Sequence, residues 1–460
     1  MIHLVLGALF LAAILGIALL GDLGMRAGPM LLLWGVAHMA YLAAAWLVVR
    51  GSRGAHRPAA RTGAFPPPLL PTIFAVGLLA RLILIPTAPT LSEDVYRYLW
   101  DGTLVARGVN PYPRAPDDPA LARFDGELLH HLNHAQVPTI YPPAAQLLFG
   151  AVARVSPTPA AWKVLVLVLE FALILALLPL LCARGLPRER LLLYYWNPLL
   201  LVESFGSGHV DLVATAFLVV ALALYEGNRH ARAGIAFGLA VMTKYVPGLL
   251  IPRLIRRGQW LLLFVAAVTA AVLATPFLEA GSALTTGLRI YARHWEFNSA
   301  LYHLLHRAIE NDLTVRRLLA AGGLAATLII AWRARSATGA AFASFVSFLL
   351  FSPTVFPWYA VPVVALLPLH PDWGMMAFSG LLALSYLPLP AYRATGTWTL
   401  PEWILWVEYG GLLGVWALAG AVALTRRVLA RRGLSGADAR VEEREDAHVE
   451  ESGEVQNEKG

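Results

Sequence analysis

Residues 69–102 read LLPTIFAVGLLARLILIPTAPTLSEDVYRYLWDG, and the two halves of this stretch have opposite character. The apolar run from Leu69 to Pro89 is long enough to enter a bilayer, whereas the segment from Ser92 to Gly102 is dense in carboxylates, Arg and aromatic rings. Because a charge inside hydrocarbon is costly, acidic residues at the end of a membrane span are candidates for function. The stretch therefore predicts a membrane helix that ends beside Glu93 and Asp94.

The composition of the whole chain is that of a polytopic membrane protein. Its 460 residues are 58% hydrophobic and 14% charged, with a mean hydropathy of +0.61, whereas soluble proteins contain about 25% charged residues. The net charge of +7 comes from short Arg clusters between apolar runs and gives no indication of nucleic-acid binding. The single cysteine, Cys182, allows neither a disulfide framework nor a cysteine metal site.

Apolar windows predict an all-α fold of about twelve full spans plus one re-entrant helix pair. The first window lacks a basic leader and a clear small-residue cleavage site, so we expect a retained span rather than a signal peptide. The membrane domain would cover residues 1–432, and the acidic tail 433–460 is expected to be disordered. The expected spans are 2–20, 29–49, 69–87, 162–182, 190–206, 208–226, 259–277, 317–333, 338–354, 355–370, 374–390 and 403–425.

Basic clusters set the expected orientation, because cytoplasmic loops of membrane proteins are rich in Lys and Arg. They put both termini in the cytoplasm and two long loops, about 89–159 and 278–316, on the extracytoplasmic side, with short interfacial helices such as 142–155 in the first loop. The clusters are Arg50, Arg53, Arg57 and Arg61; Arg184, Arg188 and Arg190; Arg229 and Arg232; Arg253, Arg256 and Arg257; Arg333 and Arg335; and Arg426, Arg427, Arg431 and Arg432.

Residues 233–251 have basic clusters at both ends, which predicts that both ends face the cytoplasm. The middle of this segment, from Thr243 to Gly248, contains a Lys, a Pro and a Gly. A re-entrant pair of short helices satisfies both features, because irregular backbone at membrane depth lines a protein or water cavity. A single tilted span is the alternative.

The charged segment after the third span predicts a helix that begins near Ser92. Asp94, Arg97, Tyr98 and Asp101 then share one face, and a carboxylate beside an Arg suits a general base toward a hydroxyl. The alternative is structural, since Ser92 is a good N-cap and acidic residues in a first turn suit the helix dipole.

The second long loop interleaves cations with aromatic rings. Arg289 and Arg293 suit a lipid phosphate, and the neighbouring rings suit a sugar attached to it. The other residues considered there are His294, Trp295 and Asn298. An interfacial aromatic belt with snorkelling Arg side chains is the alternative.

A third group lies inside the spans. Glu203, His209 and Asp211 flank a Gly-rich break and are expected to open onto one cavity, although a lone His is usually structural. Lys244 in its predicted turn has either an anionic partner in the cavity or a route to the headgroups, and Trp358 lies in a Pro-broken span end. No dedicated metal-ligand motif is present, so we expect no metal.

The order of several short motifs resembles the bacterial glycosyltransferase-C superfamily, and within it glycosyltransferase family 87 and the polyprenol-phosphate-mannose-dependent mannosyltransferases. The similarity covers most of residues 70–370. The motifs are SEDVYRYLWDGTLVARGVNPY (92–112), TIYPPAAQLLFG (139–150), WNPLLLVESFGSGHVD (196–211), MTKYVPGLLIP (242–252), YARHWEFNSALYHLL (291–305) and SPTVFPWYAVP (352–362).

The resemblance implies a multi-span, inverting transferase in the bacterial inner membrane, with an extracytoplasmic active site and a polyprenyl-phosphate sugar as donor. The family's loop acids fall on Glu93 and Asp94, of which we take Asp94 as the base. The Glu-Asp pair replaces the Asp-x-Asp of related enzymes, which weakens the case for a metal-dependent nucleotide-sugar donor. Arg97, Lys244, Arg289 and Arg293 are then expected to bind the donor phosphate, and the sugar or acceptor pocket would be lined by Tyr98, Glu203, His209, Asp211, His294, Trp295, Asn298 and Trp358.

The expected activity is thus metal-independent mannosyl transfer, without a cofactor, from a lipid-linked donor to a glycan or glycolipid acceptor, in contact with membrane lipid. A transporter or flippase of lipid-linked sugars is the alternative, since many spans and broken helices are also transporter features. The absence of an evident internal repeat argues against it.

Overall fold

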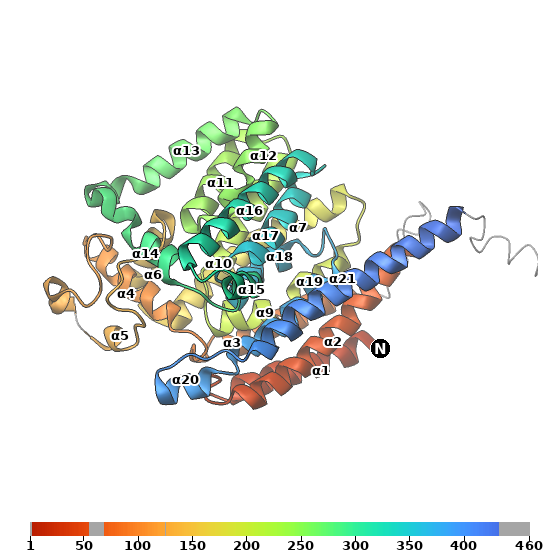
Figure 1. Cartoon of the computed structure of the whole chain (residues 1–460), viewed down its shortest axis with the longest axis horizontal. Coiled ribbons are helices and arrows are strands. Elements are labelled where there is room, and N and C mark those ends of the chain that lie inside the picture. Colours follow the sequence, from red (N-terminus) through yellow and green to blue (C-terminus); the bar gives the residue numbers. More distant parts are fainter. Residues whose placement is uncertain (1, 55–68, 125, 432–460) are drawn as a thin grey trace, which may run out of the picture.

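The computed structural model describes residues 2–54, 69–124 and 126–431, and every regular element in these ranges is a helix (Figure 1). Extended backbone pairs there at one isolated bridge, between Phe297 and Thr354. The prediction of an all-α fold is confirmed for this part of the chain. The predicted disordered tail, 433–460, lies outside the described residues.

Seven helical segments of the described chain are long and apolar enough to cross a membrane, and a bent helix pair makes an eighth if it is one span. The seven are α1 (Ile2–Leu19), α2 (Ala27–Gly54), α7 (Pro159–Ala183), α13 (Trp260–Ala274) continued by η6 (Thr275–Thr285) and α14 (Thr286–His294), α16 (Asp312–Arg333), α19 (Trp373–Leu381) continued by η8 (Leu382–Tyr386) and α20 (Leu389–Thr395), and α21 (Glu402–Arg431).

The prediction of about twelve full spans is not confirmed. Three of the expected spans are apolar helices of fewer than 18 residues, namely α3 (Leu69–Leu84), α17 (Ala337–Phe351) and the pair η7 (Pro357–Ala360) with α18 (Val361–Leu366). An apolar composition predicts that a segment prefers lipid, but it does not predict the length of the helix, which a Pro residue can end early. Two Pro residues follow α3, Pro86 and Pro89.

The expected spans 190–206 and 208–226 form the bent pair. The first is a chain of short helices, η3 (Arg188–Leu191), α8 (Leu192–Tyr195), α9 (Pro198–Leu201) and the π-helical turn η4 (Val202–Gly206). The segment Pro198–Gly206 meets α10 (Asp211–Glu226) at a bend of 117°. The break comes at the Gly-rich sequence that the sequence analysis singled out.

The segment expected to be re-entrant also breaks where predicted. α11 (His230–Thr243) ends before Lys244, and η5 (Val246–Leu250) and α12 (Ile251–Arg256) follow. That both ends lie on the same side of a membrane stays a prediction.

The first long loop is mostly helical and contains α4 (Asp94–Ala106), η2 (Pro119–Phe124), α5 (Glu127–His130) and α6 (Pro143–Val155). The second contains most of η6, all of α14 and α15 (Ala300–Ala308), and the start of α16. α4 and α6 touch backbone to backbone. A Cβ at Gly102 would lie 2.4 Å from the carbonyl oxygen of Phe149, and one at Gly150 would lie 2.6 Å from Val105. Glycine at both positions therefore allows the contact that seats α4.

The helices of the core pack in a continuous series. α10 packs on α7 and α11, and α11 packs on α13. α21 packs on α19, which also touches α2. In Figure 1, α1, α2 and α21 lie along one side of the molecule, and α4, α5 and α6 lie together at one end.

A buried ion pair ties α3, α7 and α8 together. Arg81 Nε and Nη2 donate to the two carboxylate oxygens of Glu170, each at 2.5 Å, and both side chains are almost fully buried. The hydroxyl of Tyr194 donates to Glu170 at 2.6 Å, and Arg81 Nη1 donates to the carbonyl oxygens of Gly77 and Tyr195. This network satisfies both charges, as buried charges require.

Candidate active site

The bend between η4 and α10 brings ionisable side chains together. Asn197 caps α9 with its side-chain oxygen, and Gly208 has a φ of +81°, a conformation that glycine adopts without strain. The indole N–H of Trp162 donates to the carbonyl of Gly208 at 2.6 Å, and the amide of His209 donates to the carbonyl of Glu203 at 2.9 Å. The bend is therefore fixed by local hydrogen bonds.

Asp94 reaches this bend from the start of α4. Its amide N–H donates to the hydroxyl of Ser92 at 3.2 Å. The helix therefore begins near Ser92 as predicted, although the N-cap position is occupied by Glu93, whose side chain forms no capping hydrogen bond. The Asp94 side chain is 39% exposed, and its Oδ2 lies 3.6 Å from Nδ1 of His209. Burial acts to raise the pKa of Asp94, but His209 and Lys244 outweigh it and hold that pKa below its usual range.

His209 lies between two carboxylates. Its Nε2 is 3.5 Å from Oε2 of Glu203, on the side opposite Asp94, and both His209 and Glu203 are fully buried at their side chains. The His209 ring stacks on Trp358 with centroids 3.6 Å apart and planes 16° apart. The hydroxyl of Tyr386 donates to Oε1 of Glu203 at 2.9 Å. Glu203 and His209 therefore lie together as expected. Both are fully buried, however, and of the three residues expected to open onto one cavity only Asp211 lines the pocket described below.

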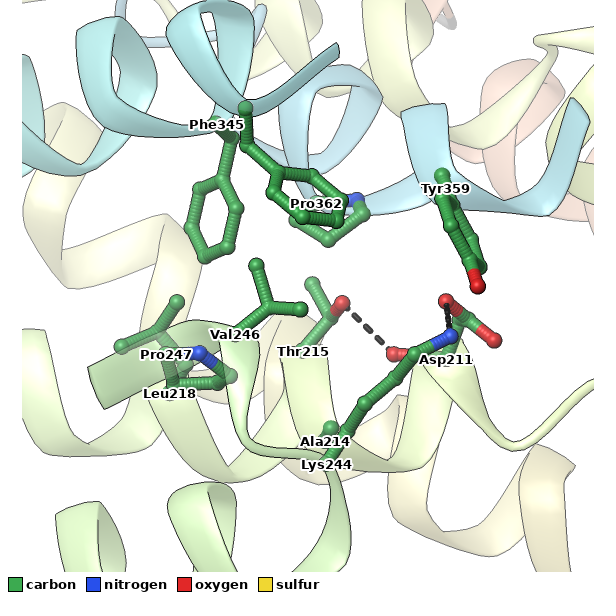
Figure 2. Close-up of a pocket in the computed structure, with 11 residues that line it drawn as sticks. Asp211, Ala214, Thr215, Leu218, Lys244, Val246, Pro247, Phe345, Tyr359 and Pro362 are labelled. Atoms are coloured by element: carbon green, nitrogen blue, oxygen red, sulfur yellow. Dashed lines mark hydrogen bonds and ion pairs between the residues drawn. The ribbon is translucent and has the colours of Figure 1, made fainter. Parts of the chain in front are cut away.

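Lys244 forms an ion pair with Asp211, the first residue of α10. Figure 2 shows Lys244 reaching from the end of α11 to the Asp211 carboxylate, with Tyr359 beside it. The ammonium lies 4.3 Å from the centroid of the Tyr359 ring, and the hydroxyls of Tyr359 and Tyr291 are 2.5 Å apart. Of the two outcomes expected for Lys244, the structure has the anionic partner.

A pocket opens at this ion pair. Its volume is about 310 Å³, including the open space at its mouth. Only three of its lining residues carry a charge or a ring hydroxyl, namely Asp211, Lys244 and Tyr359, and most of the rest are apolar (Figure 2). The remaining lining residues are Ala214, Thr215, Leu218, Val246, Pro247, Phe345, Phe348 and Pro362.

Arg97 and Tyr98, one turn after Asp94, point to different neighbours. Arg97 Nε donates to Asp101 at 2.9 Å and Nη1 donates to the carbonyl of Val137 at 3.0 Å, while Nη2 is buried without a hydrogen-bond partner. The hydroxyl of Tyr98 lies 3.5 Å from the amide nitrogen of Val210, next to His209. Tyr98 thus adjoins the bend, whereas Arg97 is committed to Asp101.

Glu93 faces away from His209 toward the segment after α5. Asn133 Nδ2 donates to Oε2 of Glu93 at 2.6 Å. Burial raises the pKa of Glu93, against the opposing effects of Arg393 and of that hydrogen bond. Close by, the rings of His134 and Trp295 meet edge to face at 4.7 Å.

The other residues predicted from the second loop do not form one group with the residues at the bend. Arg289, Arg293 and His294 are exposed, and Arg289 bonds within its own segment. Asn298 is buried, with a φ of +51°, and donates to Glu408 of α21 at 2.8 Å. Asn298 thus joins the loop to α21 rather than facing the bend.

Three tyrosines of the site were not among the predicted site residues. Tyr291, Tyr359 and Tyr386 contact Lys244, Glu203 or each other through their rings and hydroxyls. The only signal for Tyr359 was its position after Trp358 in the Pro-broken segment, and Tyr386 lies in an apolar run that offered none.

Within the described ranges, no group of three His, Cys, Asp or Glu side chains is arranged to hold a metal ion. The metal-independent reaction expected from the sequence stays a prediction.

Comparison with known proteins relates the chain to enzymes that transfer mannose. The family described as alpha-(1->6)-mannopyranosyltransferase, N-terminal domain, matches residues 5–257, more than half of the chain. Among curated proteins, none matches significantly. The matched range contains the charged residues of the bend, namely Asp94, Glu203, His209, Asp211 and Lys244. The chain belongs to this alpha-(1->6)-mannopyranosyltransferase family, and it is a multi-pass membrane glycosyltransferase that acts on mannose.

Proposed function

We propose that the enzyme transfers mannose from a polyprenyl-phosphate donor to a hydroxyl of a glycan or glycolipid acceptor, with inversion at the anomeric carbon. Asp94 accepts the proton of the acceptor hydroxyl while that oxygen bonds to the anomeric carbon. The bond from this carbon to the phosphate oxygen breaks, and its electron pair leaves with polyprenyl phosphate, whose charge Lys244 stabilises. Neither a metal nor a cofactor takes part in this proposal.

The observation that carries the proposal is an accessible carboxylate, Asp94, together with an otherwise apolar pocket that holds the Lys244–Asp211 ion pair. Lys244 and the Tyr359 hydroxyl are suited to a phosphate, and Leu218, Val246 and Phe345 are suited to a hydrocarbon chain. A nucleotide sugar would bring two phosphates, a ribose and a base to walls that offer few polar partners. The pocket therefore favours a lipid-phosphate donor.

The arrangement of the carboxylates supports a single displacement. Glu203 is fully buried, and Asp211 is 3% exposed at its side chain and paired with Lys244, whereas Asp94 is 39% exposed. A retaining reaction through a covalent intermediate needs a second carboxylate as nucleophile. Glu93 is also partly exposed, but its carboxylate bonds to Asn133. Asp94 acting alone as the base beside His209 fits inversion.

The length of α7 supports an extracytoplasmic site. Trp162 near its start bonds to Gly208 of the site, while Arg184 after its end pairs with Glu226 and bonds to Thr338 at 2.9 Å. A helix of 25 residues is about 37 Å long and spans the bilayer core. If the Arg clusters lie in the cytoplasm, the site opens on the other side of the bacterial inner membrane.

Purified enzyme given polyprenyl-phosphate [14C]mannose and a panel of glycan and glycolipid acceptors tests the proposal. Wild-type protein should transfer label, with the opposite anomeric configuration in the NMR spectrum of the product, and should not use GDP-mannose. Asp94→Asn should lose at least 100-fold in rate, because it removes the base. Asp117→Asn, the same change at an exposed Asp of the same loop, is the matched control and should keep the wild-type rate.

Full activity in Asp94→Asn would refute the role of Asp94. Flipping of the lipid-linked sugar in vesicles without mannosyl transfer would favour the transporter alternative.

A further inference from the structure

His209 is held in one orientation with a carboxylate at each ring nitrogen. Nδ1 lies 3.6 Å from Asp94 and Nε2 lies 3.5 Å from Glu203, on opposite edges of the ring. Stacking on Trp358 at 3.6 Å fixes the plane of the ring. Both nitrogens are buried without a hydrogen-bond partner in the structure. A buried imidazole nitrogen without a partner lowers the stability of the fold, so the two carboxylates are the groups that can stabilise this ring.

The protonation state of His209 decides how the two carboxylates are satisfied. A neutral imidazole has one N–H and one lone pair, so one of the two anions would face a lone pair. A doubly protonated ring presents one N–H toward Asp94 and the other toward Glu203. The positive ring then lies between the negative carboxylates of Asp94 and Glu203. Because little water reaches this position, the attraction between these charges is stronger than it would be in solvent.

Glu203 is set up to be the permanent partner of His209. Its Oε1 accepts from the Tyr386 hydroxyl at 2.9 Å, while Oε2 has no hydrogen-bond partner and faces His209. Its side chain is fully buried, so it does not contact a substrate in this conformation. A carboxylate in this position favours the protonated form of the imidazole next to it.

We propose that His209 is the positioning residue of the base Asp94, and that Glu203 keeps His209 protonated for that role. His209 then holds Oδ2 of Asp94, which leaves Oδ1 to accept the proton of the acceptor hydroxyl. Glu203 acts through His209 and touches neither substrate. This inference rests on the proposed transferase reaction, and it replaces the earlier expectation that Glu203 and His209 line a sugar pocket.

Other charged or titratable groups lie around Asp94, His209 and Glu203. All of them are unchanged in the variants compared below, so they do not account for a difference between the pH profiles. They are Asp211 and Lys244 of the ion pair, His134 and Glu93 near Asp94, and Tyr98, Tyr141, Tyr291, Tyr359 and Tyr386.

The pH profile of kcat separates this role from a structural one. In Glu203→Gln the amide no longer favours protonated His209, so the alkaline limb should move at least one pH unit lower, while kcat near pH 6 stays within about threefold of wild type. In His209→Gln, which has no titrating ring, kcat should fall at least tenfold and the limb should disappear. KM for polyprenyl-phosphate mannose should stay within about twofold in both variants.

Glu408→Gln is the matched control. Glu408 is also a fully buried Glu of a membrane helix with an amide donor, Asn298, and one oxygen without a hydrogen-bond partner, but its carboxylate is not paired with His209. Its alkaline limb should coincide with that of wild type. A Glu203→Gln limb at the wild-type position, or a kcat loss equal at every pH, would overturn the inference.

Failure of the inference is distinguishable from failure of the proposed function. If wild-type protein transfers mannose and Asp94→Asn does not, the two pH profiles alone decide the role of His209 and Glu203. If wild-type protein does not transfer mannose from the lipid donor, the proposed function fails and this inference falls with it. Should Glu203→Gln not fold, His209→Gln still decides through the presence or absence of its alkaline limb.

Discussion

Under the proposed function the Lys244–Asp211 pair has two roles, one in stability and one in donor binding, which Lys244→Met and the double variant Lys244→Met/Asp211→Asn tell apart. Asp211 is 3% exposed at its side chain, and one of its oxygens has no hydrogen-bond partner. Removing the ammonium leaves this carboxylate buried and unpaired, which costs about 3–5 kcal/mol in a fully buried pair. Because the Lys244 side chain is 22% exposed, water screens part of that cost. We expect Lys244→Met to lose about 2–3 kcal/mol of stability.

The functional loss has a separate origin. A hydrogen bond from an ammonium to a phosphate contributes about 1.5–3 kcal/mol, and each 1.4 kcal/mol is about a factor of ten in affinity. KM for polyprenyl-phosphate mannose should therefore rise about 10- to 100-fold in Lys244→Met. Asp211→Asn in the double variant removes the unpaired charge but supplies no cation. It should restore thermal stability and leave the donor KM high.

Thermal unfolding in detergent and initial-rate kinetics with varied donor measure these two effects on the same preparations. Arg114→Met, which removes an exposed cation of the first loop, controls for loss of positive charge in general. A wild-type donor KM in Lys244→Met would refute phosphate binding by Lys244. Recovery of KM together with stability in the double variant would show that Lys244 only neutralises Asp211.

Two further predictions concern the buried network and the base. Arg81→Met leaves Glu170 buried without its partner and should cost about 3–5 kcal/mol, which a scan of thermal unfolding detects. Arg81→Met/Glu170→Leu should recover most of that loss, and an unchanged melting temperature in Arg81→Met would contradict the role of the pair. Because His209 and Lys244 hold the pKa of Asp94 below its usual range, the proposed base stays ionised as the pH falls, so kcat/KM should be flat from pH 7 down to about pH 5. An acid limb centred between pH 5 and 7 in the wild-type profile would contradict this assignment.

The start of α4 was predictable because its signals are local. Ser92 followed by two acids marks a helix N-terminus, and Asp94 does lie at the first position of the helix. The partner of Arg97 was not predictable in the same way. Asp94 lies three residues before it and Asp101 four residues after, so both are within reach on the helix surface. The structure pairs Arg97 with Asp101, which frees Asp94 to approach His209.

The bend at Gly208 shows where apolar composition stops being informative. The windows 190–206 and 208–226 are both apolar enough to be spans, and nothing in their composition reveals the 117° between the two halves. Asn197-Pro198 and the glycines at 206 and 208 are the local signals of a break. They predict that the chain turns but do not give the angle, which depends on bonds such as that from Trp162 to Gly208.

Partners that come from distant segments were the least predictable part of the site. Lys244 and Asp211 are 33 residues apart, and Glu203 and Tyr386 are 183 residues apart. A tyrosine in an apolar run has the same local pattern whether it packs in the core or donates to a carboxylate. Only the tertiary arrangement of α10, α11 and η8 distinguishes these cases.

The division of the site along the chain separates two kinds of contribution to the proposed mannosyl transfer. Every charged group at the bend, including Asp94, His209 and Lys244, lies within residues 5–257, the range shared with the mannosyltransferase family. The rings that surround these charges, including Trp358 and Tyr359, come from later segments. Charge decides which protons and phosphates the site can handle, whereas ring positions decide the shape that a sugar or lipid must have. Substitutions at Trp358 or Tyr359 should therefore change the choice among donors before they abolish transfer.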